Sequence, residues 1–315
     1  MPATDLVTGA FGFTGSRISE RLLAQGRRVV TLTRRAEVDH PLAARVERLP
    51  YVFDEGTLST ALMGVDTVYV TYWMRFPRAG TTWDQLVDNV ARLSRASAAA
   101  GARRLVYISV SNARHDSSTE YFRAKARAED AVRSATTAAP VASPTTYAIL
   151  RPTLLYGAGD ILINNMAWTL RRLPLFGIPG DGNYRVQPVH VDDVADLAVQ
   201  FGSRDDQVEM DAAGPETLTF KDLVGVVRAA VRSRALIVHL PPTLVLAVTR
   251  VIGLGVRDVV LTRDEIRELM ESLLVSSDAA GTCPTRLTDW LVRNADAIGR
   301  RYSSELGRNF RLDRA

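Results

Sequence analysis

Cysteine and lysine are both scarce in this chain of 315 residues. Its single cysteine, Cys283, excludes a disulfide framework and a cysteine-based zinc site, and it favours a reducing compartment. Of the 39 basic residues, 37 are arginines and two, Lys125 and Lys221, are lysines. In so arginine-rich a chain, each lysine is a candidate for a chemical role.

Runs of like charge are lacking as well. Basic residues outnumber acidic ones by 39 to 35, which gives a formal charge of +4, but the basic residues are spread along the chain. This spread is typical of a solvated surface and disfavours nucleic-acid binding. The four histidines are far apart and lack the spacing of metal ligands, so we expect no metal site.

No stretch is apolar for long enough to cross a bilayer. The most apolar one, residues 244–256, is too short and contains Arg250. We expect a buried helix there, with an interfacial membrane helix as the alternative. The first residues show neither the basic region nor the cleavage site of a signal peptide. These features indicate a cytoplasmic protein without an integral membrane segment.

The chain does have enough apolar material, 46% of its residues, to bury a full core, and its length predicts about two domains. Short apolar runs alternate with amphipathic segments through the first half. Strands are expected at residues 6–8, 29–33, 46–52, 67–71, 105–109 and 147–151, and helices at 13–24, 84–100 and 121–133. This alternation predicts an α/β fold with a doubly wound parallel (Rossmann) sheet covered by helices on both faces.

The pattern changes after residue 157, where the chain becomes helix-rich with irregular Gly/Pro stretches. Two further strand-like pieces, residues 186–191 and 207–211, are expected to return to the sheet. We therefore predict a sheet domain of residues 1–157 with returning segments at about 186–214. Residues 158–185 and 215–315 would form a smaller, mostly helical lobe on the substrate side. Thr262 and Glu265 have the spacing of a capping box that starts a late helix.

The strongest local motif is VTGAFGFTG at residues 7–15, with Gly9, Gly12 and Gly15 interleaved with Phe11 and Phe13. It follows the first predicted strand and opens the first predicted helix. Glycine permits close approach of the backbone to a pyrophosphate, and a helix N-terminus offers free N–H groups. The spacing is a variant of the dinucleotide-binding turn, and the alternative is an ordinary strand-to-helix turn.

The residues after the second and third strands bear on the choice of cofactor. An acidic residue after the second strand would accept the ribose hydroxyls of NAD, but Arg34 and Arg35 stand there, with no carboxylate until Glu37. Arginine pairs well with the 2′-phosphate of NADP, so NADP is favoured over NAD, unless the two arginines are simply surface residues. Asp54 follows the third strand and either contacts the adenine or caps a helix.

A tyrosine and a lysine stand four residues apart in the motif YFRAK. This spacing places Tyr121 and Lys125 on one face of a helix that follows the fifth strand. Reduction of a carbonyl needs a proton donor, and a cation about 4 Å away can lower a phenol pKa by up to about three units. Ser109 and Ser111 end the fifth strand, where either hydroxyl could polarise a substrate oxygen.

Aromatic residues follow the fourth strand, and they either wall an apolar substrate site or pack in the core. They are Tyr72, Trp73, Phe76 and Trp83. Asn164, Asn165 and Trp168 could add to such a site from the second lobe. We therefore expect a small-molecule substrate, of apolar or aromatic character if these side chains line the site. The sequence leaves a homodimer open.

Together these motifs resemble the short-chain dehydrogenase/reductase superfamily in its extended or atypical branch. The matching pieces are TGAFGFTG, Asp54, AGARRLVYIS, YFRAK with Glu129 after it, LRPTLLYGAGD and QPVHVDDVA, in the right order over most of the chain. The chain is similar in particular to bacterial NAD-dependent epimerase/dehydratase-like proteins related to the nucleotide-binding accessory subunit of respiratory complex I. LTRDEIRELM and LGRNF fit that group.

The resemblance implies that the three glycines hold the pyrophosphate of NADP. Lys125 would bind the nicotinamide ribose and assist Tyr121 as general acid/base, and Ser111 would polarise the substrate. The implied activity is an NAD(P)-dependent oxidoreductase that transfers a hydride between NADP(H) and a carbonyl or hydroxyl group, with an epimerase as a subclass. The loop between Ser111 and Tyr121 is short for the extended branch, so a non-catalytic NADPH-binding sensor or scaffold is the alternative.

Overall fold

The computed structural model describes residues 2–34, 37–138, 144–277 and 281–309. The chain divides into two compact units, which are treated separately below. Unit 1 comprises Met1–Pro152 and Val194–Asp211, and unit 2 comprises Thr153–Asp193 and Ala212–Ala315.

Unit 1 is built on a seven-stranded sheet. Its strands are β1 (Thr4–Val7), β2 (Arg28–Thr33), β3 (Val46–Pro50), β4 (Val65–Val70), β5 (Arg104–Ile108), β6 (Thr146–Pro152) and β11 (Val208–Ala212), in the order β11-β6-β5-β4-β1-β2-β3. β1 to β6 pair in parallel. The strand order reverses between β1 and β4, and in such sheets ligands bind in the crevice outside the carboxyl ends at this point.

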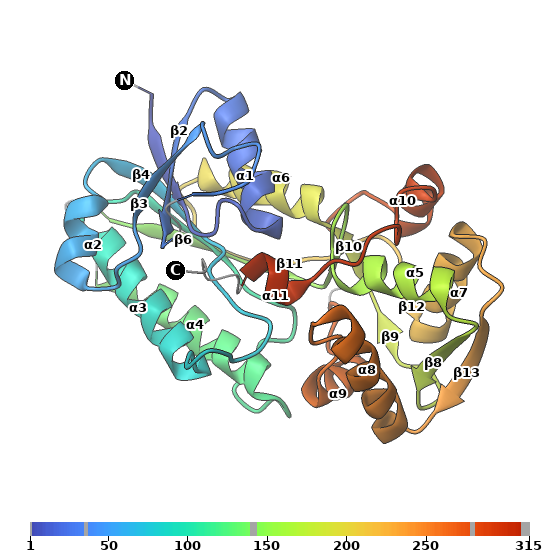
Figure 1. The fold of residues 1–315 in the computed structure, drawn as a ribbon. Helices are drawn as coiled ribbons and strands as arrows, with labels where there is room; N and C mark the ends of the chain where they lie inside the picture. Colours follow the sequence, from blue (N-terminus) through green and yellow to red (C-terminus); the bar gives the residue numbers. More distant parts are fainter. Residues whose placement is uncertain (1, 35–36, 139–143, 278–280, 310–315) are drawn as a thin grey trace. The chain divides into compact units, whose positions relative to one another are not determined.

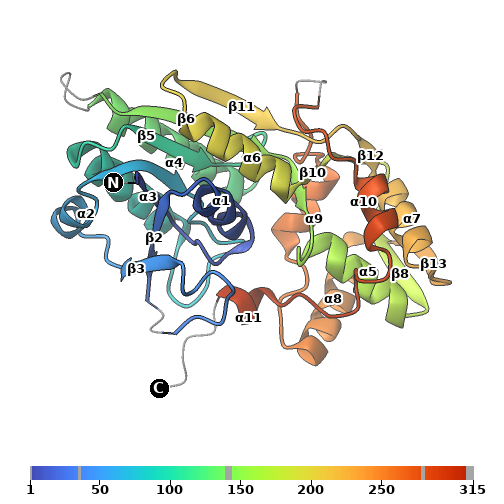
Figure 2. The same ribbon diagram turned by 90° about the horizontal axis from the view of Figure 1, so that it is seen from above.

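Helices cover both faces of this sheet, as Figures 1 and 2 show. On one face lie α1 (Phe13–Ala24) and α6 (Val191–Gly202), and on the other lie α2 (Glu55–Ala61), α3 (Trp83–Ala99) and α4 (Glu120–Thr137). Successive residues of β5 alternate between the two cores: Val106 and Ile108 pack with α1 and α6, whereas Leu105 and Tyr107 pack with α3 and α4. The doubly wound α/β fold expected from the sequence is confirmed.

Unit 2 combines helices with three two-stranded sheets. Its core gathers buried side chains from several elements, with Tyr156, Phe220 and Trp290 among the largest. The predicted capping box is present, because Thr262 accepts from the N–H of Glu265 at 3.2 Å and its own N–H donates to that carboxylate at 2.8 Å. The elements are β7 (Leu154–Tyr156), α5 (Leu162–Arg172), β8 (Leu175–Pro179), β9 (Arg185–Val186), β10 (Pro188–His190), β12 (Leu218–Thr219), α7 (Phe220–Ala230), β13 (Leu236–Leu240), α8 (Pro242–Val256), α9 (Arg263–Met270), α10 (Leu287–Asn294) and α11 (Glu305–Asn309).

One of the two strand pieces expected to return to the sheet does so. Residues 207–211 correspond to β11, which pairs with β6 at the edge of the large sheet. β9 and β10 do not join that sheet: β9 pairs with β12 and β10 pairs with β7, all within unit 2. The first part of unit 1 ends at Pro152 rather than at residue 157, and the chain re-enters it at Val194. Strands of two or three residues carry too little pattern to show which sheet they join, and here they pair with short neighbours.

The most apolar helix, α8, is not buried as expected. Val245 and Gly253 are its buried residues, whereas Val251 and Leu254 are 69% and 81% exposed. The expectation was wrong because a helix that is apolar all round shows no preferred face in its sequence, and only one side of α8 packs into unit 2. No helix in the described part of the chain combines the length and the apolarity needed to span a bilayer.

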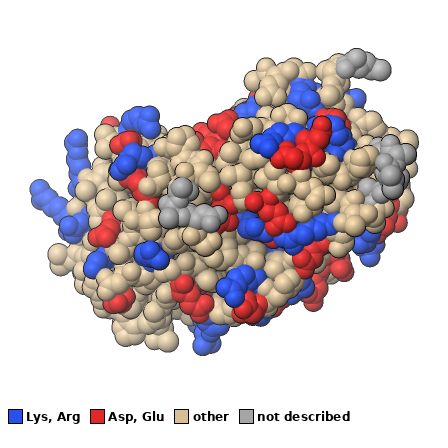
Figure 3. All heavy atoms as spheres, turned by 180° about the vertical axis from the view of Figure 1, so that it is seen from behind, with Lys and Arg blue, Asp and Glu red and all other residues tan. Residues whose placement is uncertain are grey.

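Charges are intermixed on the face of the molecule in Figure 3, where basic and acidic side chains lie beside one another. Many of the described charges form ion pairs, such as Arg133 with Glu209 at 2.6 Å and Arg204 with Asp206 at 2.6 Å. Among the described residues on that face, no extended patch of one sign is visible, in keeping with the spread of arginines along the sequence.

Candidate functional site

The glycine turn lies between β1 and α1 at the carboxyl edge of the sheet. Gly9 has a φ of +66°, which favours glycine, and its carbonyl accepts a hydrogen bond from the N–H of Gly12 at 2.7 Å. A Cβ atom at Gly15 would lie 2.2 Å from that same carbonyl oxygen, so this position requires glycine. Phe11 and Phe13 flank Gly12, and both are half-buried.

The first turn of α1 begins at a glycine. Gly12 is the N-cap residue, and as a glycine it has no side chain that could cap the helix. The N–H groups of the first turn lie at the carboxyl edge of the sheet and carry the positive end of the helix dipole. A helix N-terminus in this position is suited to an anion.

Threonine hydroxyls tie the glycine turn to the neighbouring strands. Thr8 Oγ1 accepts from the N–H groups of Thr71 and Tyr72, which follow β4, at 2.9 and 3.0 Å. On the other side, Thr31 of β2 donates to the carbonyl of Val7 at 2.7 Å. These bonds hold the carboxyl ends of β4, β1 and β2 together, and this is the crevice that the strand order predicts.

Arg34 stands at the end of β2, as the sequence indicates. Its guanidinium carbon lies 4.4 Å from the ring centroid of Tyr51, which follows β3. The Tyr51 ring packs in turn against Phe53 at 4.9 Å and Tyr72 at 6.0 Å between centroids. Arg35 lies outside the described residues. Tyr51 was not among the residues expected at the site, although it is an aromatic residue between the third predicted strand and Asp54.

Asp54 caps a helix. Its Oδ2 accepts from the N–H and from the hydroxyl of Thr57, both at 2.9 Å, and these bonds hold the pKa of the carboxyl below its usual value. Of the two roles that the sequence left open, the structure shows the cap at the start of α2. The contact with an adenine stays a prediction.

Tyr121 and Lys125 both lie on α4, in the first and second turns. The Tyr121 ring meets Trp83 and Trp73 edge to face, at 5.6 and 6.4 Å between centroids. Trp73 and Trp83 are stacked on each other at 6.1 Å. Two residues of the aromatic segment, Trp73 and Trp83, therefore gather beside the tyrosine.

The Lys125 side chain is almost fully buried, with 2% of its surface exposed. Its Nζ donates to the carbonyl of Ile108 at 2.9 Å and lies 4.2 and 4.9 Å from the ring centroids of Trp73 and Tyr107. Burial lowers the pKa of Lys125 to about 7, against a smaller opposing effect of the Glu129 charge. An ammonium in this position can act on the nearby phenol through its charge.

The two serines end β5 on the same side of the sheet as Lys125. Their N–H groups donate to Leu150 and Pro152 of β6 at 2.7 and 2.9 Å, so the strand alternation continues past Ile108. Ser111 is 0% exposed, whereas Ser109 is 6% exposed, and its Oγ has no hydrogen-bond partner within the described structure. The unpartnered hydroxyl at this edge therefore belongs to Ser109.

Three residues of unit 2 that could line the substrate site make contacts within that unit, and their contact with a substrate stays a prediction. The side chains of Asn164 and Asn165 donate to the carbonyls of Arg301 and Ser303, both at 2.9 Å. The Trp168 ring packs edge to face on Tyr302 at 5.3 Å. They anchor the segment before α11, a distant partner that the local sequence could not reveal.

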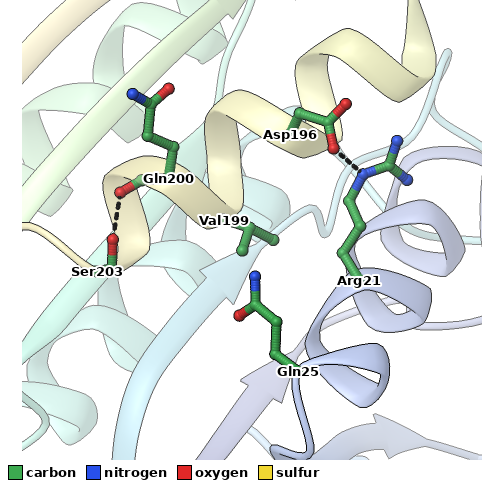
Figure 4. A pocket seen from close by; sticks show the side chains of 6 residues that line it. All are labelled: Arg21, Gln25, Asp196, Val199, Gln200 and Ser203. Carbon is green, nitrogen blue, oxygen red and sulfur yellow. Dashed lines mark hydrogen bonds and ion pairs between the residues drawn. The ribbon is translucent and has the colours of Figure 1, made fainter.

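A shallow pocket opens between α1 and α6 on the opposite face of the sheet from α4 (Figure 4). An ion pair between Arg21 and Asp196 crosses it. It lies toward the C-terminal ends of both helices, so it is remote from the glycine turn and contains none of the predicted site residues. Within the described residues, no group of three His, Cys, Asp or Glu side chains could hold a metal.

Comparison with known proteins bears out the resemblance. The model of the NAD dependent epimerase/dehydratase family matches residues 6–211. The ceramide reductase of Caulobacter vibrioides is 29% identical over 198 residues, which are 62% of this chain and 59% of that protein. The mitochondrial 40 kDa subunit of NADH-ubiquinone oxidoreductase from Neurospora crassa is 25% identical over 285 residues, which are 88% of this chain and 73% of that subunit. The chain thus spans less than two thirds of the ceramide reductase.

A solved structure shares the fold over nearly the whole chain. The triphenylmethane reductase of Citrobacter sp., complexed with NADP(H), is similar with a TM-score of 0.73 over 93% of this chain and 99% of that one, at 17% identity. The family match covers well over half of the chain and includes the glycine turn, Arg34 and the Tyr121/Lys125 helix. The chain therefore belongs to the NAD dependent epimerase/dehydratase family.

Proposed function

We propose that this protein transfers a hydride between NADP(H) and a carbonyl or hydroxyl group of a small substrate, with Tyr121 as general acid/base. The observation that carries the proposal is the placement of Tyr121 and Lys125 together on α4, beside the end of β5. The glycine turn stands in the same unit, at the same edge of the sheet. The turn that would bind the dinucleotide and the residue that would transfer the proton therefore both lie at the carboxyl edge of the same sheet.

The residues present fit a dinucleotide. Gly15 leaves no room for a Cβ, and the N-cap residue of α1, Gly12, has no side chain. Gly9, Gly12 and Gly15 would hold the diphosphate, with Phe11 and Phe13 beside it. Lys125 would hold the nicotinamide ribose. When bound, the dinucleotide supplies or accepts the hydride.

The proton would come from Tyr121. In the reducing direction the carbonyl carbon gains a hydride and its oxygen gains the phenolic proton, so that C=O becomes CH–OH, and the phenolate is then reprotonated from water. The charge of the Lys125 ammonium would favour the phenolate form of Tyr121. Ser111, or Ser109 with its unpartnered hydroxyl, would donate a hydrogen bond to the substrate oxygen.

Arg34 supports the choice of NADP over NAD. The guanidinium lies over Tyr51 at the end of β2, where the adenosine ribose of a dinucleotide would lie. A 2′-phosphate could pair with Arg34 and with its sequence neighbour Arg35. Asp54 would contact the adenine from its place at the start of α2.

The aromatic side chains around Tyr121 support an apolar or aromatic substrate. Trp73 and Trp83 place two indole rings within 6.4 Å of the phenol, between centroids. Apolar walls with few polar groups are typical of small-molecule sites. Two of the compared proteins are named as reductases of ceramide and of triphenylmethane.

The decisive experiment replaces Tyr121 with phenylalanine. NADPH oxidation is measured over a panel of aromatic and aliphatic carbonyl compounds, and NADPH affinity is measured by calorimetry. Tyr121→Phe should abolish turnover and leave NADPH affinity within about twofold. Tyr147→Phe serves as the matched control, because its hydroxyl contacts Glu209 rather than the site. Unchanged turnover in Tyr121→Phe would remove this tyrosine from the mechanism.

A second candidate function, NADPH binding without chemistry, is favoured by the burial of Lys125. Its Nζ is engaged with Ile108 rather than directed at an open site. One compared relative is a subunit of a larger oxidoreductase. Tight NADPH binding with no oxidation across the carbonyl panel would support this sensor or scaffold, and substrate-dependent oxidation would eliminate it.

The proposal also covers location and assembly. Cys283 is buried, and a chain with a single cysteine forms no internal disulfide, which suits a reducing cytoplasm. A homodimer is the assembly to test, by light scattering with and without NADPH.

A further inference from the structure

We propose that Trp73 is a positioning residue that keeps the side chain of Lys125 protonated beside Tyr121. The inference rests on the proposed function for its purpose, but it concerns contacts that exist in the protein before any cofactor binds. It adds Trp73, which follows β4, to the pair of Tyr121 and Lys125 on α4.

The Lys125 ammonium has an unusual set of neighbours. One carbonyl oxygen, that of Ile108, accepts its hydrogen bond at 2.9 Å, and the faces of Trp73 and Tyr107 lie at 4.2 and 4.9 Å from Nζ. Among the described residues no carboxylate forms an ion pair with it. Since burial disfavours the charged form, the rings are the main compensation beyond that one oxygen.

The charged and titratable groups around Lys125 do not supply the missing countercharge. On α4, Glu129 acts on Lys125 at a distance, but Arg133 and Arg151 bind its oxygens at 2.9 and 2.6 Å. Arg151 comes from β6, so this element offers a second cation. From α3, Asp84 pairs with Arg127 at 3.0 Å.

Two tyrosines complete the titratable neighbours of Lys125. Tyr107 on β5 is fully buried, and this burial raises the pKa of its phenol well above the usual value. Tyr121 on α4 is the proposed proton donor itself. Tyr107 therefore supplies no negative charge near pH 7. Besides the Ile108 carbonyl and the more distant charge of Glu129, the ring faces of Trp73 and Tyr107 stabilise the ammonium, and the indole of Trp73 is the closer of the two.

Trp73 touches both members of the pair. Its ring lies under the ammonium of Lys125 and meets the Tyr121 ring edge to face at 6.4 Å. Trp83 stacks on the Trp73 ring at 6.1 Å between centroids. The preceding residues, Thr71 and Tyr72, are bonded through their N–H groups to Thr8 in the glycine turn, which fixes where the indole stands.

The two lysines of the chain make the inference directly measurable. Lysine labelled with ¹³C at Cε should give two NMR signals, from Lys125 and Lys221, which Lys221→Arg assigns. Both titrations are followed with ordinary tryptophan and with fluorinated tryptophans, in which the ring face is progressively less electron-rich while the shape is nearly kept. Lys221 bonds to Asn183 at 2.7 Å on the surface and is the internal control.

We expect the Lys125 pKa to fall stepwise with fluorination, by about one unit in total. The Lys221 pKa should not move. Trp73→Phe should lower the Lys125 pKa as well, whereas Trp83→Phe should not, because Trp83 contacts Trp73 and Tyr121 but not the ammonium. A Lys125 pKa that is the same in fluorinated and ordinary protein overturns the inference.

Failure of this inference can be told from failure of the proposed function. If NADPH supports turnover but Lys125 does not respond to fluorination, Trp73 has no such role and the oxidoreductase stands. If Lys125 responds but no dinucleotide binds, the contact stands and the proposed function fails. In an active enzyme, fluorination should also move the acidic limb of the pH profile of kcat, with little change in KM.

Discussion

A Cβ atom at Gly15 would lie 2.2 Å from the carbonyl oxygen of Gly9, so the first turn of α1 rests directly on the glycine turn. Gly15→Ala must push α1 away from this carbonyl, and the N–H groups of its first turn move with it. We expect NADPH affinity to fall at least tenfold and the melting temperature to drop. Calorimetry and circular dichroism measure the two effects.

Gly225→Ala is the matched control for this substitution. A Cβ at Gly225, in α7 of the other unit, meets no atom within 4 Å, and alanine is the better helix former. This variant should bind NADPH as the wild type does and melt at an equal or higher temperature. Equal NADPH affinity in Gly15→Ala and Gly225→Ala would contradict the role of the turn.

Arg34 and Tyr51 should set the preference for NADP. Removing the guanidinium with Arg34→Ala loses a charge-assisted contact of about 1.5–3 kcal/mol, so NADPH affinity should fall roughly tenfold or more while NADH affinity stays constant. Tyr51→Leu removes the ring under the guanidinium and should act in the same direction but less strongly. Tyr51→Phe keeps the ring and is the control. If the double variant Arg34→Ala/Arg35→Ala still binds NADPH in preference to NADH, these arginines do not bind the 2′-phosphate.

Lys125 should make folding stability depend on pH. Burial lowers its pKa to about 7 from the usual 10.5, so between these values the unfolded chain binds a proton that the folded chain lacks. The free energy of unfolding therefore rises with pH across this window. Lys125→Met should be more stable than the wild type at pH 7, by about 1–3 kcal/mol after the lost contacts are counted, with the difference shrinking toward pH 10.

Denaturant midpoints at pH 7 and pH 10 test this, with Lys221→Met as the control on an exposed lysine. Less stable Lys125→Met protein at pH 7 would mean that the contacts of the ammonium outweigh its burial. The same substitution should remove catalytic activity, so stability and function are opposed at this position.

Asp160 should show the opposite pH dependence in unit 2. Burial raises the pKa of its carboxyl to about 7 from 3.8, and Oδ2 has no hydrogen-bond partner within the described structure. The folded chain therefore binds a proton that the unfolded chain lacks between about pH 4 and pH 7, and stability falls as pH rises through that range.

Asp160→Asn keeps an acceptor for the N–H groups of Ile163 and Asn164, which the carboxylate now binds at 2.7 and 3.2 Å. The variant should match the wild type near pH 4 and exceed its melting temperature at pH 8. Asp181→Asn, at an exposed carboxyl, is the control. A parallel pH dependence of Asp160→Asn and wild type would show that Asp160 does not titrate in this range.

Local patterns in the sequence were enough for the sheet of unit 1 and for the glycine turn. The strand and helix periods are properties of neighbouring residues, and the spacing of Tyr121 and Lys125 places both on one helix face whatever surrounds them. Local patterns could not predict which segments far apart in the chain contact one another. The pairing of β10 with β7, the exposed side of α8 and the bonds of Asn164 to Arg301 depend on segments that meet only in the folded chain.

The same limit applies to the site. Aromatic residues after a strand are common in cores, so the sequence left Trp73 open between the substrate site and the core, and Tyr51 was not singled out. Their contacts with Lys125 and Arg34 arise because the ends of β4 and β3 approach α4 and β2 in the assembled sheet. Likewise, the difference between the Ser109 and Ser111 hydroxyls is a matter of surroundings rather than of residue type.

The most direct test is calorimetric titration of the wild-type chain with NADPH and NADH, repeated with Gly15→Ala. The account predicts one NADPH per chain, weaker binding of NADH, and loss of most of the NADPH affinity in the variant. A wild-type chain that binds neither dinucleotide would contradict it.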